Sequence, residues 1–483
     1  MLNPSIPVLF LQSVILLLHT AFGLCFILKK VLCKESKQLG LFDIFCLGLG
    51  GAIGSGIFVM MGSGIAATGR SIFISVAFGC LFMLMAYFFH VVMSSMFVLE
   101  GGDYDMKAML FNPTLTGISA VFTMMGGIGF AMYGGAIADY ASMVFPVIGE
   151  YTKLVGVGII TLFFAATIKG SSCVSKINNV MTVVLIASIA LFVIMGLPKV
   201  QPGFFDLDGM FAGGASGFIV SLSIMAFACQ GTTMSPIAMM SVTKNSKRTI
   251  PLGVLLITVC LALIYGLMAV VAAGVLPIEQ VANKNLALVA QAIFPNWLYV
   301  IFIIGGAVFA IATSLISGIA MMRYPAMRVA QDGWLPDFFK KTTKSGYPWV
   351  IQLTFYLFSI LPIIFGFSLD SIVSLTMIPS MLMCFAQNIS LIKIVKKFPK
   401  QWNESVIHMP TPIFNVLCVI AGICDLIVAY NLFVTMDLTG MLLVVAMCVV
   451  CVVIALIRLK SDAIDLQALE NRKQAVMDEA ANS

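Results

Sequence analysis

Thirteen apolar runs divide the chain, and most of them are long enough to cross a lipid bilayer as a helix. About 20 apolar residues span the hydrocarbon core as a helix, whereas a transmembrane strand needs only about ten. The runs are longer and more continuously apolar than such strands, so the sequence predicts an all-α integral membrane protein. The expected spans are 6–28, 41–68, 72–99, 113–145, 154–168, 177–197, 211–240, 252–276, 297–322, 349–367, 371–395, 412–433 and 438–458.

The basic residues predict how these spans are oriented. With 60% hydrophobic and only 10% charged residues, the chain lacks the charged surface of a soluble protein. If 41–68 runs outward from the cytoplasm and later spans alternate, the outer side holds Arg70, Lys153, Lys199 and Lys284, and the other 23 of 27 basic residues lie inside. This asymmetry predicts a multi-pass protein of the cytoplasmic membrane with a cytoplasmic C-terminus. The net charge of +6 therefore marks topology rather than nucleic-acid binding.

Glycine and small polar residues interrupt two of the expected spans. The second span contains Gly51–Gly56 (GAIGSG), and the seventh contains Phe227–Pro236 (FACQGTTMSP). These interruptions are centred on Gly54 and Gly231, 177 residues apart, with four spans between them. The two broken spans therefore enter the membrane from opposite sides. Such a pair of breaks predicts a transporter built from two inverted repeats of five helices.

This pattern predicts a 12-helix core that carries a 5+5 inverted repeat. Segment 6–28 has no basic region before it, so it does not read as a cleavable signal peptide, and whether it forms an extra helix stays open. The expected parts are an N-terminal segment with a basic linker (1–38), helices 1–5 (39–197), helices 6–10 (198–400), helices 11–12 (401–460) and a polar cytoplasmic tail (461–483).

A helix that breaks inside a membrane leaves backbone groups that lipid cannot satisfy, so the break must face protein, water or a ligand. The N–H groups that begin the next half-helix form an anion site at the positive end of its dipole. Donors in Ile53–Gly56 suit an α-carboxylate, and carbonyls around Gly50–Ala52 and Cys229–Gln230 suit an ammonium group or a cation. The alternative is that Gly50 and Gly54 only allow close helix packing. Five glycines within nine positions favour binding.

Four motifs resemble those of the amino acid–polyamine–organocation (APC) family of permeases. In that family a G-[AS]-x-I-G-[SA]-G-[IV]-F stretch is the unwound part of the first core helix. The other three motifs follow helices 2, 6 and 8. The matching stretches are LGLFDIFCLGLGGAIGSGIF (Leu39–Phe58), EGGDY (Glu100–Tyr104), TKNSKRTIP (Thr243–Pro251) and RYPAMRVAQDGWLPDFF (Arg323–Phe339).

The resemblance implies a LeuT-like fold that moves an amino acid or a related amine by alternating access. The residues that match the family's carboxylate-binding segment are Ile53, Gly54, Ser55 and Gly56. The residues that match the unwound part of helix 6, which receives the amino group and the side chain, are Ala228, Cys229, Gln230 and Gly231. Phe227 matches an aromatic residue that often covers the substrate.

Two departures from the family bear on the substrate and the coupling ion. Many relatives carry an acid shortly after the helix 6 glycine, where this chain has Thr232 and Thr233. We therefore expect a neutral amino acid before a cationic one or a polyamine. Helix 5 lacks the lysine of some proton-coupled relatives, which favours exchange or a sodium site, with H⁺ kept as the other candidate coupling ion. Thr313 and Ser314 are candidate sodium ligands, and Asp139 is a candidate coupling residue, against structural hydrogen-bonding roles for all three.

The sequence carries no enzyme signature. It has no nucleophile elbow, P-loop lysine or H-E-x-x-H motif. Cys448 and Cys451 form a C-x-x-C inside the last span without further ligands, so we expect no metal site and no cofactor. The expected partners are a small amino acid and the lipid bilayer, with a homodimer left open. The first alternative function is a polyamine or cationic amino-acid permease. A channel or a receptor is a less favoured one, because no ring of charges occurs at repeated positions.

Overall fold

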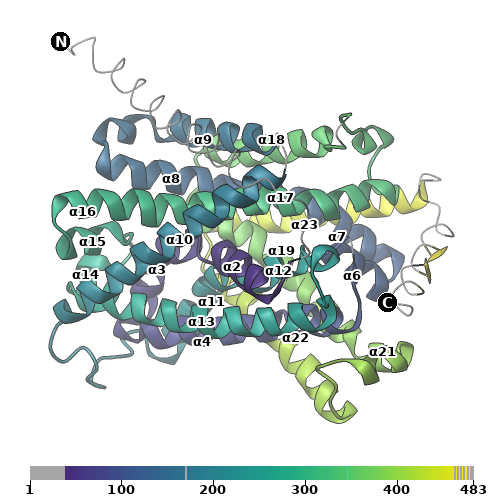
Figure 1. Ribbon diagram of the computed structural model, residues 1–483, viewed down its shortest axis with the longest axis horizontal. Coiled ribbons are helices and arrows are strands. Elements are labelled where there is room, and N and C mark those ends of the chain that lie inside the picture. Colours follow the sequence, from purple (N-terminus) through teal and green to yellow (C-terminus); the bar gives the residue numbers. More distant parts are fainter. Residues whose placement is uncertain are drawn as a thin grey trace, which may run out of the picture.

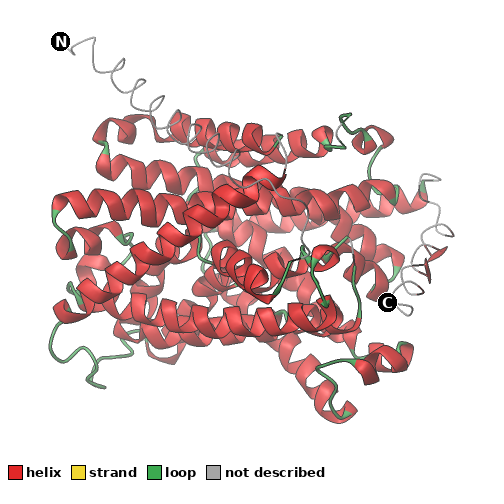
Figure 2. Ribbon diagram, viewed as in Figure 1, coloured by secondary structure: helices red, strands yellow, loops and turns green. Residues whose placement is uncertain are grey.

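The computed structural model describes residues 39–99, 101–168, 171–344 and 346–461, and a few positions between 464 and 478 (Figure 1). This part of the chain consists of helices joined by loops and contains no strand (Figure 2). Its one isolated backbone pairing joins Leu39 to Thr243. The all-α prediction is confirmed. The expected span 6–28 and most of the tail 461–483 lie outside the described residues.

The helices follow the expected spans from residue 41 onward. Their bounds are α2 Leu41–Ala52, α3 Ser55–Thr68, α4 Ile72–Ala86, α5 Phe88–Met96, α6 Asp103–Leu110, α7 Pro113–Met125, α8 Phe130–Val144, α9 Thr152–Thr167, α10 Ser171–Gly196, α11 Gly214–Cys229, α12 Gly231–Ile237, α13 Ser246–Gly274, α14 Ile278–Val281, α15 Ala287–Ile293, α16 Asn296–Ile301, α17 Phe309–Gln331, α18 Trp349–Phe365, α19 Leu369–Leu391, α20 Ile394–Lys397, α21 Pro399–Glu404, α22 Thr411–Val434 and α23 Leu438–Lys460. Within the described residues, ten helical stretches are long and apolar enough to cross a membrane, and α2 and α18 are shorter apolar helices.

The first helix break occurs where the glycine-rich stretch predicts it. Helix α2 ends at Ala52 and α3 begins at Ser55, so Ile53 and Gly54 separate the two helices. Gly54 is the cap residue of α3 and offers no side chain to the N–H groups of the first turn. The break therefore leaves the start of α3 without a side-chain cap.

The second break is shorter than expected. Helix α11 ends at Cys229 and α12 begins at Gly231, so Gln230 alone separates them, and its backbone keeps helical angles (φ −65°, ψ −27°). The Thr232 and Thr233 hydroxyls donate to the carbonyls of Cys229 and Gln230. Such back-bonding satisfies carbonyl groups that an unwound segment would expose.

The two broken helices cross each other at the centre of the bundle. Helix α2 packs against α12, and α3 packs against α11 (Figure 1). A Cβ atom at Gly231 would lie 2.6 Å from the Ala52 Cα, and one at Gly56 would lie 2.7 Å from the Ala228 Cβ. Both distances are too short for carbon atoms in contact, so these crossings require glycine. Glycine here serves close packing as well as the break.

Two segments outside the expected membrane spans contain helix. The EGGDY motif leads into α6, which begins at Asp103. Helix α17 continues to Gln331, beyond the expected end of its span at residue 322. Its extension is held by buried contacts, since Val329 packs with Tyr104 and Trp334 in one apolar cluster. Burial of this surface favours helix over a solvated loop.

Candidate functional site

A cavity of about 220 Å³ lies beside both helix breaks. The predicted binding residues in its wall are Gly54, Gly56, Phe227, Ala228, Gln230 and Gly231. Phe130 and Tyr133 of α8 and Met321 and Met322 of α17 add aromatic and thioether side chains to the wall. The structure therefore brings two sequence segments about 177 residues apart to one mostly apolar cavity.

Two predicted binding residues, Ile53 and Cys229, have side chains that do not line the cavity. The Ile53 side chain is fully buried, and its N–H donates to the Leu49 carbonyl at 2.8 Å, which completes the last turn of α2. The Cys229 Sγ lies 3.2 Å from the Cys80 Sγ of α4, so this side chain contacts α4 rather than the cavity. The side chain of Ser55 is outside the described atoms. The backbone donors that remain beside the cavity are those of Gly54, Ser55 and Gly56.

Helix α3 presents its positive end at the cavity wall. The first four N–H groups of a helix have no acceptor within it, and Gly54 provides no side-chain acceptor. The aligned peptide dipoles give this end about half a positive charge. A carboxylate that enters the cavity can therefore accept hydrogen bonds from the start of α3 without a cationic side chain.

The Tyr265 hydroxyl joins the ends of the two broken helices. It donates to the Ala52 carbonyl at 2.9 Å and lies 3.4 Å from the Ala228 carbonyl. Tyr265 belongs to α13 and is fully buried. Sequence reasoning missed this residue, because nothing in its local sequence distinguishes it from other aromatic residues of an apolar span.

The candidate sodium ligands contact the end of α2. The Thr313 hydroxyl lies 3.4 Å from the Gly50 carbonyl and donates to the Ala310 carbonyl at 2.8 Å. The Ser314 hydroxyl donates to the Gly51 carbonyl at 3.3 Å. These hydroxyls already satisfy carbonyls that were expected to face an ammonium group or a cation. Oxygen atoms of these types also bind hard cations, so a sodium role stays a prediction.

Asp139 lies apart from the central cavity. It lines a second cavity of about 200 Å³ together with Ser63, Lys284 and Asp370. Asp370 stands in the first turn of α19 and was not singled out by the sequence. In the predicted topology this second cavity is on the outer side, as Lys284 is. If Asp139 takes part in ion coupling, it would do so from this second cavity and not beside the helix breaks.

The central cavity is closed on one side and extends toward the other. On the closed side, the Tyr140 hydroxyl donates to the Phe58 carbonyl at 2.7 Å, and the Phe58 ring centroid lies 6.1 Å from both the Tyr140 and the Phe302 centroids. On the opposite side, the wall continues to Asp103 and Tyr324. This is the cytoplasmic side in the predicted topology.

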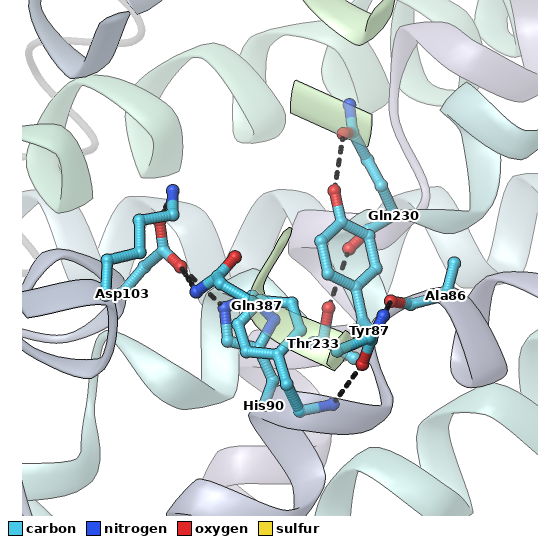
Figure 3. Close-up of polar contacts among 10 residues, drawn as sticks. Ala86, Tyr87, His90, Asp103, Gln230, Thr233 and Gln387 are labelled. Atoms are coloured by element: carbon cyan, nitrogen blue, oxygen red, sulfur yellow. Dashed lines mark hydrogen bonds and ion pairs between the residues drawn. The ribbon is translucent and has the colours of Figure 1, made fainter. Parts of the chain in front are cut away.

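Asp103 anchors a polar cluster at that end of the cavity. Its Oδ1 lies 3.0 Å from the His90 Nε2 and accepts from the Gln387 Nε2 at 3.3 Å (Figure 3), and its Oδ2 accepts from the Lys107 ammonium. Burial alone would raise the pKa of Asp103, but Lys107 and His90 together hold it below its usual range. The carboxylate is therefore ionised at neutral pH. Asp103 belongs to the EGGDY motif that resembles the permease family, but the sequence pattern indicated no function for this residue.

A tyrosine links this cluster to the second helix break. Tyr87 separates α4 from α5, and its hydroxyl donates to the Gln230 Oε1 at 3.4 Å (Figure 3). The Tyr87 ring also stacks on the His90 ring, with centroids 5.1 Å apart. The side chain at the second break is thus connected to the Asp103 end of the cavity.

Crossed, interrupted membrane helices around a central cavity define the class of transport proteins that bind substrate at broken helices. The family comparison agrees with this class. The chain belongs to the amino acid permease family, whose model matches residues 39–459, within the APC superfamily. Membership and the transporter relatives indicate a multi-pass membrane transporter.

Individual relatives are distant. The chain is 26% identical over 337 residues to the branched-chain amino acid permease BcaP of Bacillus subtilis, covering 63% of this chain and 69% of that protein. It is 26% identical over 341 residues to the methylthioribose transporter of Bacillus subtilis, covering 64% and 70%. It is 24% identical over 227 residues to the cadaverine/lysine antiporter of Escherichia coli, covering 46% and 51%. These names span neutral and cationic substrates.

Proposed function

We propose that this protein carries amino acids with uncharged side chains across the cytoplasmic membrane by alternating access, as a permease or an exchanger. The observation that carries the proposal is the uncapped start of α3 in the wall of a mostly apolar cavity. The N–H groups of Gly54, Ser55 and Gly56 would hold the α-carboxylate. The Gln230 Oε1, which accepts one hydrogen bond from the Tyr87 hydroxyl, would accept a second from the α-ammonium group.

The substrate side chain would occupy the apolar part of the cavity. The residues that contribute to this part of the wall are Phe227, Ile237, Met321 and Met322. Thioether side chains adapt to ligands of varied shape, and this apolar part of the wall favours an uncharged side chain over a cationic one. The similarity to a branched-chain amino acid permease supports the same substrate class.

Alternating access would require the closed side of the cavity to open. The cavity reaches Asp103 and is sealed beyond Gly56 by Phe58 and Tyr140. With the C-terminus in the cytoplasm, this arrangement corresponds to an inward-facing state. Rocking of the broken helices would then expose the same site to the outer side.

Uptake into proteoliposomes tests the proposal. The full chain would be reconstituted and given leucine, methionine, alanine, lysine and cadaverine, with H⁺ and Na⁺ gradients imposed separately. We expect saturable uptake of the apolar amino acids and faster uptake when the same amino acid is preloaded inside. Preference for lysine or cadaverine would support the cationic alternative. Flux without saturation or counterflow would indicate a channel, and the absence of any amino acid uptake would contradict the proposal.

A further inference from the structure

The central cavity contains one charged side chain among the described residues of its wall, that of Asp103. Gly102 and Tyr324 flank it at the end of the cavity, away from the start of α3. The remaining described wall is built from glycine and from uncharged polar, thioether, aliphatic and aromatic residues. An isolated carboxylate here would attract a substrate with a second ammonium group.

The Asp103 carboxylate is not isolated, because Lys107 neutralises it. The two residues are four positions apart on α6, and the Lys107 ammonium contacts the Asp103 Oδ2. The Lys107 side chain is 9% exposed and is not among the described cavity residues, whereas the Asp103 side chain is 16% exposed. Lys107 therefore contacts the carboxylate from within the protein and leaves the cavity with little net charge.

The other groups around the carboxylate do not replace this positive charge. His90 and Gln387 both contact the Asp103 Oδ1, and a neutral imidazole or an amide adds hydrogen bonds without neutralising a carboxylate. The nearby Asp105 has its own partners, the Gly101 N–H at 2.7 Å and the Arg328 Nε at 4.0 Å. The pairing of Asp103 with Lys107 thus decides the charge at this end of the cavity.

We propose that Lys107 determines substrate specificity: by neutralising Asp103 it excludes amino acids and diamines with a second ammonium group. A cationic side chain that approaches Asp103 would meet a carboxylate that is already paired and an ammonium group close behind it. This inference rests on the proposed function and adds to it the residue that restricts its substrate range. Lys107 acts through Asp103, so it is a positioning residue that does not touch the substrate.

The test is the ratio of lysine uptake to leucine uptake by the full chain in proteoliposomes at neutral pH. Lys107→Met keeps an unbranched apolar stem but removes the charge, and we expect the ratio to rise on the order of tenfold or more. Lys107→Gln removes the charge but keeps a hydrogen-bond donor for Asp103, so it should raise the ratio even if Lys107→Met does not fold. Lys107→Arg should keep the wild-type ratio.

A double variant distinguishes an effect of the Asp103 charge on the uptake ratio from an effect of the Lys107 substitution on the structure. Asp103→Asn combined with Lys107→Met removes both charges, so its ratio should return toward that of the wild type. An unchanged ratio in a folded Lys107→Met or Lys107→Gln protein that still transports leucine would overturn the inference. Wild-type preference for lysine over leucine would also overturn it. Failure of the wild type to move any amino acid would instead contradict the proposed function.

Discussion

The Tyr265 hydroxyl lies 2.9 Å from the carbonyl oxygen of Ala52, the last residue of α2. It also lies 3.4 Å from the carbonyl of Ala228, one residue before the end of α11. Carbonyl groups in the last turn of a helix have no donor within that helix. One buried side chain on α13 therefore joins both broken helices at the point where they cross.

Tyr265→Phe should destabilise the protein, because it leaves the buried Ala52 carbonyl without this donor. We expect the free energy of unfolding in detergent to fall by about 1–3 kcal/mol. Tyr430→Phe is the matched control, since Tyr430 is 66% exposed on α22. Equal stability of the two variants would show that Tyr265 contributes packing alone.

Asn388 satisfies backbone groups on both sides of the junction between α4 and α5, so its replacement should destabilise the protein. Its Nδ2 donates to the Ala86 carbonyl at 2.7 Å, and its Oδ1 accepts from the Phe89 N–H at 3.1 Å, on either side of the junction between α4 and α5. Asn388→Ala leaves both buried groups unpaired, so we expect a loss of about 2–5 kcal/mol in the free energy of unfolding. The matched control is Asn431→Ala, because Asn431 donates within its own helix to the Ile427 carbonyl.

Asp425 holds the amide of Asn388 in this orientation. Its Oδ2 accepts from the same Asn388 Nδ2 at 2.8 Å, and it is fully buried. Asn388→Asp would keep the acceptor for Phe89 but remove the donor to Ala86 and set a second carboxyl group against Asp425. We expect this variant to be at least as unstable as Asn388→Ala. A more stable Asn388→Asp protein would contradict the assigned bonds.

The features that could be predicted from the sequence are those that residues within a single segment determine. Run length and composition predict the helices, and the glycines of GAIGSG predict the break at Ile53 and Gly54. The second break is shorter than predicted because Thr232 and Thr233 donate to carbonyls of the preceding turn. The sequence showed these hydroxyls but not the rotamers that direct them to the backbone.

The contacts that could not be predicted join residues far apart in the chain. Asn388 and Ala86 are 302 positions apart, and Asp103 and Gln387 are 284 apart. No pattern within one segment states which side of a buried helix faces which neighbour. For the same reason Cys229, next to Gln230 in sequence, contacts α4 while Gln230 lines the cavity.

Gly54→Val should abolish uptake by adding a side chain at the proposed carboxylate site. A Cβ at this position would lie 2.7 Å from the Ser314 Cβ and would also overlap its hydroxyl. We expect loss of substrate binding together with about 1–3 kcal/mol of packing strain. Gly158→Val is the control, because a Cβ at Gly158 on α9 meets no atom within 4 Å. Uptake by Gly54→Val at the Gly158→Val level would argue against the site.

Tyr140→Phe should make the closed side of the cavity open more often, since it removes the bond from the Tyr140 hydroxyl to the Phe58 carbonyl. A single hydrogen bond of about 0.5–1.5 kcal/mol corresponds to an increase of about two- to tenfold in the open population.

Ser63, which lines the second cavity with Asp139, provides a reporter position. We expect a membrane-impermeant maleimide to label Ser63→Cys faster in the Tyr140→Phe background, after correction for labelling of the chain without Ser63→Cys. Tyr151→Phe, at a tyrosine 54% exposed, should leave the labelling rate unchanged. Equal rates in all three backgrounds would show that this bond does not hold the closed side shut.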